Sequence, residues 1–210
     1  MAEQGPEGRS AREEDAADHE GDAEDQPADE VSLRIRRLVS VDEVHGLTPH
    51  LADYVRFVCD DLVRAGAPRF QPDGLLSKTL AHLQDVVPPR GYAFVAEDDG
   101  DAVLGMVFLR PSGAGAMEIK RLYVPPAGRG MGVGRALVMA AVAAAQEAGA
   151  AVVRLDSTRN LTPALDLYRK LGFVERDAFP ESDLAGDPVL GPWAIYMELP
   201  LSPQGQSIQR

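Results

Sequence analysis

The spacing of apolar residues along the chain switches between two periods, and each period predicts one kind of element. Apolar and polar residues alternate over Val31–Val39, as in a strand with one buried face. Short apolar runs bounded by glycine, proline or acidic turns predict further strands. These cover Gly91–Ala96, Val103–Leu109, Met117–Val124, Val152–Asp156 and Ala194–Leu199, with a shorter segment near Phe173–Glu175.

Apolar residues three and four positions apart predict amphipathic helices between these strands. The first has Thr48 as its N-cap and Pro49 as its first helical residue, and it ends before Gly66. The second is capped by Asp73 and ends at the Pro88-Pro89 pair. Two later helices are predicted over Arg135–Ala148 and, with Thr162 as its cap, over Pro163–Leu171.

Mixed strands with helices packed against them predict an α/β or α+β fold. Residues 31–200 have a fitting length for one domain with one core. Residues 1–30 hold twelve acidic side chains, two basic ones and no aromatic ring, which predicts a disordered acidic tail. Residues 201–210 predict a short flexible tail at the other end.

The net charge of −12 is concentrated in the predicted tail, which carries −10 of it. The nearly neutral remainder argues against nucleic acid as a partner. The longest apolar run, Ala136–Ala145, is too short to span a bilayer, so we expect no membrane contact. The N-terminal residues MAEQGPEGRS lack the basic and apolar regions of a secretory signal, and we therefore expect a cytoplasmic protein.

A phosphate-binding signature lies between the strand ending at Val124 and the next helix. Gly130, Gly132 and Gly134 alternate with larger residues, and this pattern exposes consecutive backbone N–H groups where a helix begins. An arginine on either side of the glycines adds formal positive charge. A diphosphate is the natural ligand of such a segment.

Two familiar phosphate motifs do not fit this segment. A Walker A loop needs a lysine followed by serine or threonine, and the segment contains no lysine. The dinucleotide fingerprint G-x-G-x-x-G lacks its last glycine whether Gly128, Gly130 or Gly132 opens it.

The segment Arg129-Gly130-Met131-Gly132-Val133-Gly134 resembles the acyl-CoA loop of the GNAT superfamily of N-acetyltransferases, whose pattern is Arg/Gln-x-x-Gly-x-Gly/Ala. The resemblance extends to EIKRLYV before the loop and to RLDSTRNLTPALDLYRKLGF after it. It implies the GNAT fold, a mixed, mostly antiparallel twisted sheet that is splayed at the cofactor site and carries helices on both faces. It also implies acetyl-CoA as the co-substrate.

The resemblance implies cofactor-binding roles along the segment. The exposed backbone of Leu122, Tyr123 and Val124 would pair with the pantetheine arm, and the Val124 N–H would face the thioester carbonyl. Asn160 resembles the asparagine that meets the cofactor beyond the next strand. The pyrophosphate would be held by Arg129, Gly130, Met131, Gly132, Val133, Gly134 and Arg135.

The resemblance also implies two catalytic residues. Tyr168 matches the tyrosine that protonates the departing thiolate, and its unperturbed pKa of about 10 suits that task. Glu118 coincides with a glutamate that some relatives use as a general base through water. Structural alternatives stay open: Tyr168 as core, Glu118 facing solvent or paired with Lys120, and Asn160 as a cap of the Thr162-Pro163 turn.

We expect the acceptor between the two early helices and the loop over residues 176–192. The acidic and aromatic residues of that loop suit a cationic amine, and they equally suit an ordinary solvated loop. The acceptor is a small-molecule amine or, alternatively, a protein N-terminus or lysine; a non-catalytic acyl-CoA-binding sensor is the third reading. Cys59, the single cysteine, and four scattered histidines predict no metal. A homodimer is left open.

Overall fold

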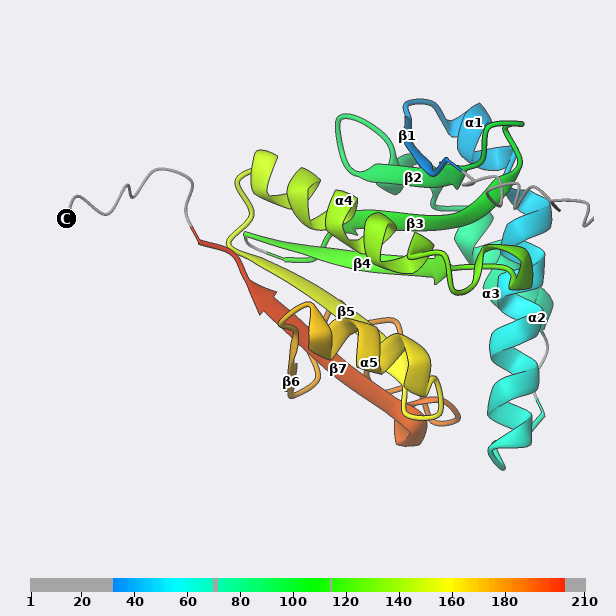
Figure 1. Ribbon diagram of the computed structural model, residues 1–210. Coiled ribbons are helices and arrows are strands. Elements are labelled where there is room, and N and C mark those ends of the chain that lie inside the picture. Colours follow the sequence, from blue (N-terminus) through cyan, green and yellow to red (C-terminus); the bar gives the residue numbers. More distant parts are fainter. Residues whose placement is uncertain (1–31, 70–71, 114, 203–210) are drawn as a thin grey trace, which may run out of the picture. The chain divides into compact units, whose positions relative to one another are not determined.

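The computed structural model describes residues 32–69, 72–113 and 115–202. The tail predicted over 1–30 and most of the one over 201–210 lie outside these residues. The described chain forms a seven-stranded sheet in the order β1-β2-β3-β4-β5-β7-β6 (Figure 1). Its strands are β1 (Arg34–Leu38), β2 (Tyr92–Glu97), β3 (Val103–Pro111), β4 (Ala116–Tyr123), β5 (Val152–Thr158), β6 (Val174–Arg176) and β7 (Ala194–Pro200).

Helices flank this sheet, and three short 3-10 turns connect its parts. The α-helices are α1 (Val41–His45), α2 (Thr48–Arg64), α3 (Pro72–Leu80), α4 (Val133–Glu147) and α5 (Thr162–Lys170). The 3-10 turns are η1 (Leu83–Val86), η2 (Pro126–Gly128) and η3 (Gly191–Trp193). None of the described helices is both long and apolar enough to cross a membrane.

The strands pair antiparallel except for β4 and β5, which run parallel and are joined through α4. The mixed, mostly antiparallel sheet is therefore confirmed. A parallel pair needs a long crossover, and α4 supplies it. The order also places the loop between β4 and α4 at the carboxyl end of a central strand.

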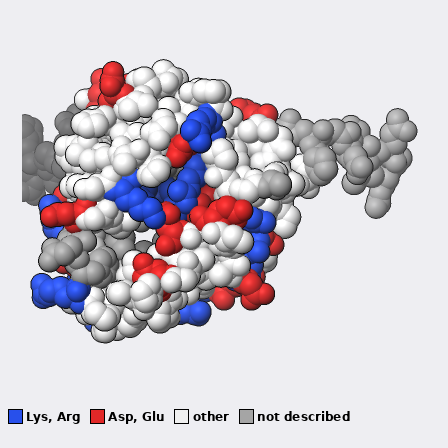
Figure 2. All heavy atoms as spheres, turned by 180° about the vertical axis from the view of Figure 1, so that it is seen from behind, with Lys and Arg blue, Asp and Glu red and all other residues white. Residues whose placement is uncertain are grey.

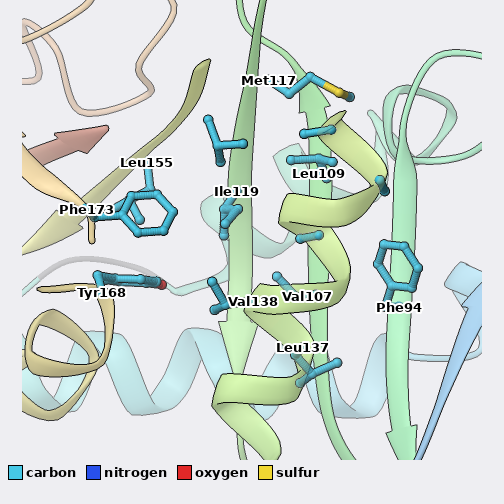
Figure 3. Packing of buried hydrophobic residues seen from close by; sticks show 14 of the residues in the cluster. Phe94, Val107, Leu109, Met117, Ile119, Leu137, Val138, Leu155, Tyr168 and Phe173 are labelled. Carbon is cyan, nitrogen blue, oxygen red and sulfur yellow. The ribbon is translucent and has the colours of Figure 1, made fainter. Parts of the chain in front are cut away.

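Each face of the sheet has its own core. On one face, α4 packs through Leu137 and Val138 onto β2, β3 and β4, and Tyr168 of α5 belongs to the same core, as Figure 3 shows. On the other face, Val44 of α1 and Leu51 of α2 pack against β2 and β3. Helices on both faces are therefore confirmed.

The predicted helix starts were wrong by one or two residues. Helix α2 begins at Thr48 with Leu47 as its N-cap, and the Thr48 hydroxyl donates to the His45 carbonyl instead. Helix α3 begins at Pro72, so Asp73 lies in its first turn. Helix α5 begins at Thr162, without a side-chain cap. A proline near the start fixes only the first turn, because its φ suits several early positions.

The second predicted helix was wrong in its length, and one helix was missed. Helix α3 ends at Leu80, and the 3-10 turn η1 follows. Leu83 and Val86, three residues apart, lie on one side of a 3-10 turn, which lets both enter the core beneath β2 and β3. The missed helix α1 starts with a capping box between Ser40 and Glu43, a pattern visible in the sequence.

Candidate active site

The backbones of β4 and β5 part in the middle of the sheet. Their pairing runs from Ala116 opposite Val152 to Ile119 opposite Leu155 and then stops. Beyond that point β5 continues along β7 while β4 continues along β3. Figure 1 shows the two strands diverging, with α2 beyond the open end. The expected splay is therefore confirmed, and β4 keeps an unpaired edge past Ile119 in the described chain.

A β-bulge in β4 lies beside this unpaired edge. Phe108 of β3 is opposite Lys120 and Met106 is opposite Tyr123, so β4 holds one extra residue between the two pairs. Arg121 in the bulge has φ +54°, in the left-handed region that few non-glycine residues adopt. Lys120 and Arg121 line the same pockets, whereas neighbours in a regular strand point to opposite faces. The bulge thus aims two successive basic side chains at one face.

Side chains from both faces of the sheet surround the gap between β4 and β5, which is a cleft of about 100 Å³. Leu122 of β4 and Tyr168 of α5 line it from the α4–α5 side. Tyr54 of α2, Leu75 of α3 and Leu184 of the late loop line it from the other side. The cleft therefore lies between the two early helices and the loop over 176–192.

The glycine loop ends at the N-terminus of α4. Gly130 and Gly132 have φ of +83° and +77°, and Gly132 is the N-cap of the helix. A Cβ added at either position would meet no atom within 4 Å, so the backbone is open to a ligand there. The first N–H groups of a helix have no intrahelical partner, and here they begin at Val133. Open backbone and free donors together are the features of an anion-binding site, so we call this segment the candidate anion site.

The rest of the loop joins this candidate anion site to the end of β4. A Cβ on Gly134 would lie 3.2 Å from Leu167 of α5 and 3.7 Å from Val124, so a larger residue would press α4 away from both. Arg129 donates from Nε to the Val124 carbonyl oxygen at 3.3 Å. Arg135, Met131 and the loop glycines Gly130 and Gly132 are exposed, whereas Val133 is buried.

Lys120 lies where the β4–β5 pairing ends, and its ammonium group contacts three carboxylates. Its Nζ is 3.0 Å from Glu118, 2.8 Å from Asp156 and 3.1 Å from Asp183. Arg110 binds the second oxygen of Glu118 at 2.9 Å and lies 3.4 Å from Asp183. Because the acids surround cations, no group of described residues is arranged to hold a metal ion. We call these five residues the charge cluster.

Burial and charge oppose each other in the charge cluster. Burial acts to lower the pKa of Lys120, but Asp156 and Glu118 outweigh it and hold the pKa above its ordinary value. Burial raises the pKa of Glu118 despite the nearby cations. For Asp183, burial is outweighed by Lys120 and Arg110, so its pKa lies below the usual range. Lys120 is therefore protonated at neutral pH and is not a general base.

Tyr168 reaches the cleft from α5. Its ring packs against Phe173 with 5.6 Å between ring centroids. Figure 3 shows the hydroxyl directed toward the strand that carries Ile119. Burial raises the pKa of Tyr168. The phenol thus stays protonated at neutral pH, which is the form that donates a proton.

Several residues expected at the site lie elsewhere. Glu118 is fully buried, with both carboxylate oxygens on Lys120 and Arg110, and it does not line the cleft. The Tyr123 ring packs on the side of α2, 6.1 Å from the ring of Tyr54. The amide of Asn160 donates to Asp61 of α2, and its buried oxygen has no partner in the described chain.

Sequence reasoning missed Arg110, Arg121 and Asp156, which lie at or beside the cleft. It treated Lys120 only as a partner of Glu118, and it included Asp183 only among the acidic residues of the late loop. One signal was available. Charged residues stood inside segments predicted as strands, and a buried strand accepts a charge only when a partner compensates it. Charged residues inside a predicted strand show which strands need a compensating partner. They do not show which residues are the partners, because a partner such as Asp183 comes from a distant loop.

Comparison with known proteins identifies relatives of this chain. An uncharacterised N-acetyltransferase of Schizosaccharomyces pombe is 34% identical over 116 residues, which cover 55% of this chain and 67% of that protein. An IAA acetyltransferase of Azospirillum brasilense is 32% identical over 126 residues, which cover 60% of this chain and 78% of the relative.

A solved structure and a family model agree with these relatives. The PaiA N-acetyltransferase of Thermoplasma acidophilum, solved in complex with coenzyme A, superposes with a TM-score of 0.55 over 81% of this chain and 99% of that one, at 18% identity. Residues 59–173 match the model of the acetyltransferase (GNAT) family, and this match spans more than half of the chain. The chain therefore belongs to the acetyltransferase (GNAT) family.

Proposed function

We propose that this protein transfers the acetyl group of acetyl-CoA to an amine held in the cleft between β4 and β5. One observation carries the proposal. The unpaired edge of β4, the candidate anion site at the start of α4 and the protonated Tyr168 all border the same splay in the sheet. A thioester bound along that edge would present its carbonyl to the cleft and its diphosphate to the loop.

The residues of the loop fit the diphosphate of acetyl-CoA. The left-handed glycines Gly130 and Gly132 keep side chains away from the backbone, and free N–H groups at the helix start would donate to phosphate oxygens. Arg129 and Arg135 are exposed and add positive charge. The coenzyme A bound to the related Thermoplasma acetyltransferase supports the same ligand here.

The proposed reaction needs one proton donor and one oxyanion site. A neutral amine attacks the thioester carbon, the C–N bond forms, and the C–S bond breaks. Tyr168 gives its proton to the departing thiolate. The amine nitrogen loses one proton to solvent as the amide forms, and a second proton from solvent restores Tyr168. The Val124 N–H, at the end of the unpaired edge, is the proposed donor to the developing oxyanion.

Glu118 supports the reaction chiefly by holding Lys120 and Arg110 beside the cleft. Its oxygens lie 3.0 Å from Lys120 Nζ and 2.9 Å from Arg110 Nη2. A role as general base through water, which the family resemblance implies, stays a prediction. Asn160 likewise stays a predicted cofactor contact, through its unpartnered oxygen.

The size of the cleft favours a compact acceptor. Side chains from three helices, two strands and the late loop enclose about 100 Å³, which suits a small molecule better than a peptide segment. We therefore place a small-molecule amine ahead of a protein N-terminus or lysine.

Isothermal titration tests the cofactor, and a turnover assay tests the reaction. Acetyl-CoA and coenzyme A should bind in the micromolar range, while ATP and NADH bind far more weakly, because the pantetheine arm pairs with β4. The release of free thiol from acetyl-CoA across a panel of amines should then reveal acceptors. Binding of ATP as tight as that of acetyl-CoA would contradict the proposal.

A further inference from the structure

Arg121 borders the cleft with a charge that no carboxylate of the described chain balances. Its Nε donates to the Thr79 hydroxyl at 3.0 Å, and its guanidinium lies over the Tyr54 ring, 5.9 Å from the centroid. Its two terminal nitrogens have no hydrogen-bond partner among the described residues. They are the donors that would form a paired contact with a carboxylate.

The other basic side chains around Arg121 are already paired. The cleft adjoins a recess between α3, η1 and β3 that charged side chains border, and the two share Lys120, Arg121 and Asp183. Figure 2 shows basic and acidic side chains gathered around a hollow on this side of the molecule. Every other basic residue that lines the cleft or the recess contacts an acid: Lys78 with Asp183, His82 with Asp85, Arg110 with Glu118, and Lys120 with Asp156.

The backbone is strained at the point that aims Arg121. The left-handed region is unfavourable for a non-glycine residue, and a regular strand would have turned this side chain to the opposite face. Thr79, only 8% exposed, then fixes the guanidinium. Arg121 thus combines a strained backbone, a buried hydrogen-bond partner and a charge without an acidic partner among the described residues. These features fit a side chain that is preorganised to bind an anion.

We propose that Arg121 binds a carboxylate of the acceptor, so the acceptor is an amine that also carries a carboxylate, as amino acids do. The inference rests on the proposed function and names its substrate class. Arg121 precedes Val124 by three residues, which is at most about 10 Å of extended chain. The Arg121 side chain and a compact amino acid bound to it through its carboxylate can together cover this distance to a thioester near Val124.

Matched acceptors provide the first test. The panel contains the common amino acids and, for each, the corresponding amino-acid amide, which keeps the side chain and the amine but lacks the carboxylate. The free-thiol assay should show turnover of one or more amino acids, with kcat/KM at least about tenfold lower for the amide. Assays at a pH above the pKa of both amines keep their reactivity comparable.

Variants of Arg121 provide the second test. Asparagine tolerates the left-handed backbone, so Arg121→Asn removes the charge without disturbing the bulge. The KM for the amino acid should rise by about 10- to 100-fold, while KM for the amide and the acetyl-CoA affinity stay unchanged. Arg121→Lys keeps the charge but loses the paired contact. Its KM for the amino acid should therefore lie between those of the parent protein and of Arg121→Asn.

The outcomes separate this inference from the proposed function. Failure to bind acetyl-CoA would overturn both. If acetyl-CoA binds but only amines without a carboxylate are acetylated, the carboxylate inference is overturned and the proposed function stands. The inference is also overturned if Arg121→Asn raises the KM for the amino acid and the KM for its amide by the same factor.

Discussion

Lys120 illustrates at the residue scale how a buried charge depends on its partners. The side chain is only 5% exposed and contacts Glu118, Asp156 and Asp183. Taking these charges out of water is costly, and only their mutual contacts offset that cost. Removing one member therefore does more harm than the loss of a single contact would suggest.

We predict that Lys120→Met lowers the free energy of unfolding by about 3–5 kcal/mol at neutral pH, because it leaves buried carboxylates uncompensated. Urea denaturation followed by circular dichroism would measure the loss. The matched control is Arg56→Met, because the pair between Arg56 and Asp53 is 65% and 52% exposed. That variant should lose less than about 1 kcal/mol.

We predict that the free energy of unfolding lost in Lys120→Met depends on pH. Without Lys120, the pKa values of Asp156 and Asp183 in the folded state should rise above the unfolded value of about 3.9. A carboxyl with a raised folded pKa destabilises the fold above that pKa, and the penalty is relieved as pH falls through it. The stability gap between Lys120→Met and the parent should narrow from pH 7 to pH 4; a constant gap would contradict the electrostatic cause.

Tyr168→Phe separates acid catalysis from packing, because it removes one hydroxyl and keeps the ring beside Phe173. If the hydroxyl protonates the thiolate, kcat should fall by about 10²- to 10⁴-fold with acetyl-CoA affinity little changed. The control is Tyr196→Phe, whose ring packs on Phe179 away from the cleft. A change in kcat of less than about threefold in Tyr168→Phe would assign the residue to the core alone.

At the scale of elements, β4, the glycine loop and α4 act as one unit. The bulge turns the end of β4 toward the cleft, and the loop carries the chain directly into the helix. Two glycines at the ends of α4 can be compared, since Gly132 precedes its first turn and Gly149 follows its last. Both have positive φ, +77° and +75°, and a Cβ on either would meet no atom within 4 Å.

We predict that Gly132→Val raises the dissociation constant for coenzyme A by more than about tenfold, because the new side chain would stand where the diphosphate approaches. Gly149→Val imposes a similar backbone strain at the other end of α4. It should lower the melting temperature by a similar amount and leave the affinity unchanged. Titration calorimetry and thermal denaturation of both variants provide the comparison, and equal affinities would show that the phosphate site lies elsewhere.

At the scale of the whole molecule, the domain is two sheet segments joined by four parallel residue pairs between β4 and β5. Each face has its own helices and core, and the core on the α4–α5 face contains residues of both segments. The cleft passes through this parting and meets side chains from both faces. The glycine loop leads into α4 on one face, whereas the proposed acceptor site is lined by elements of both faces.

The sequence by itself determined the features that depend on neighbouring residues. Alternation and helical spacing predicted the strands and most helices, because burial of one face repeats with the period of the element. The glycine loop before a helix predicted an anion site, because backbone freedom and free N–H groups are local properties. Helix ends were less well defined, since the prolines near Thr48 and Thr162 suit more than one starting position.

Only the tertiary structure decided what lies inside the cleft. Lys120 meets Asp156, 36 residues away, because of the register between two parallel strands, and it meets Asp183 because a loop folds over both. The face of Arg121 depends on a bulge defined by pairing with β3. Strand register and ion pairing arise from contacts between distant segments, and no local pattern of residues encodes them.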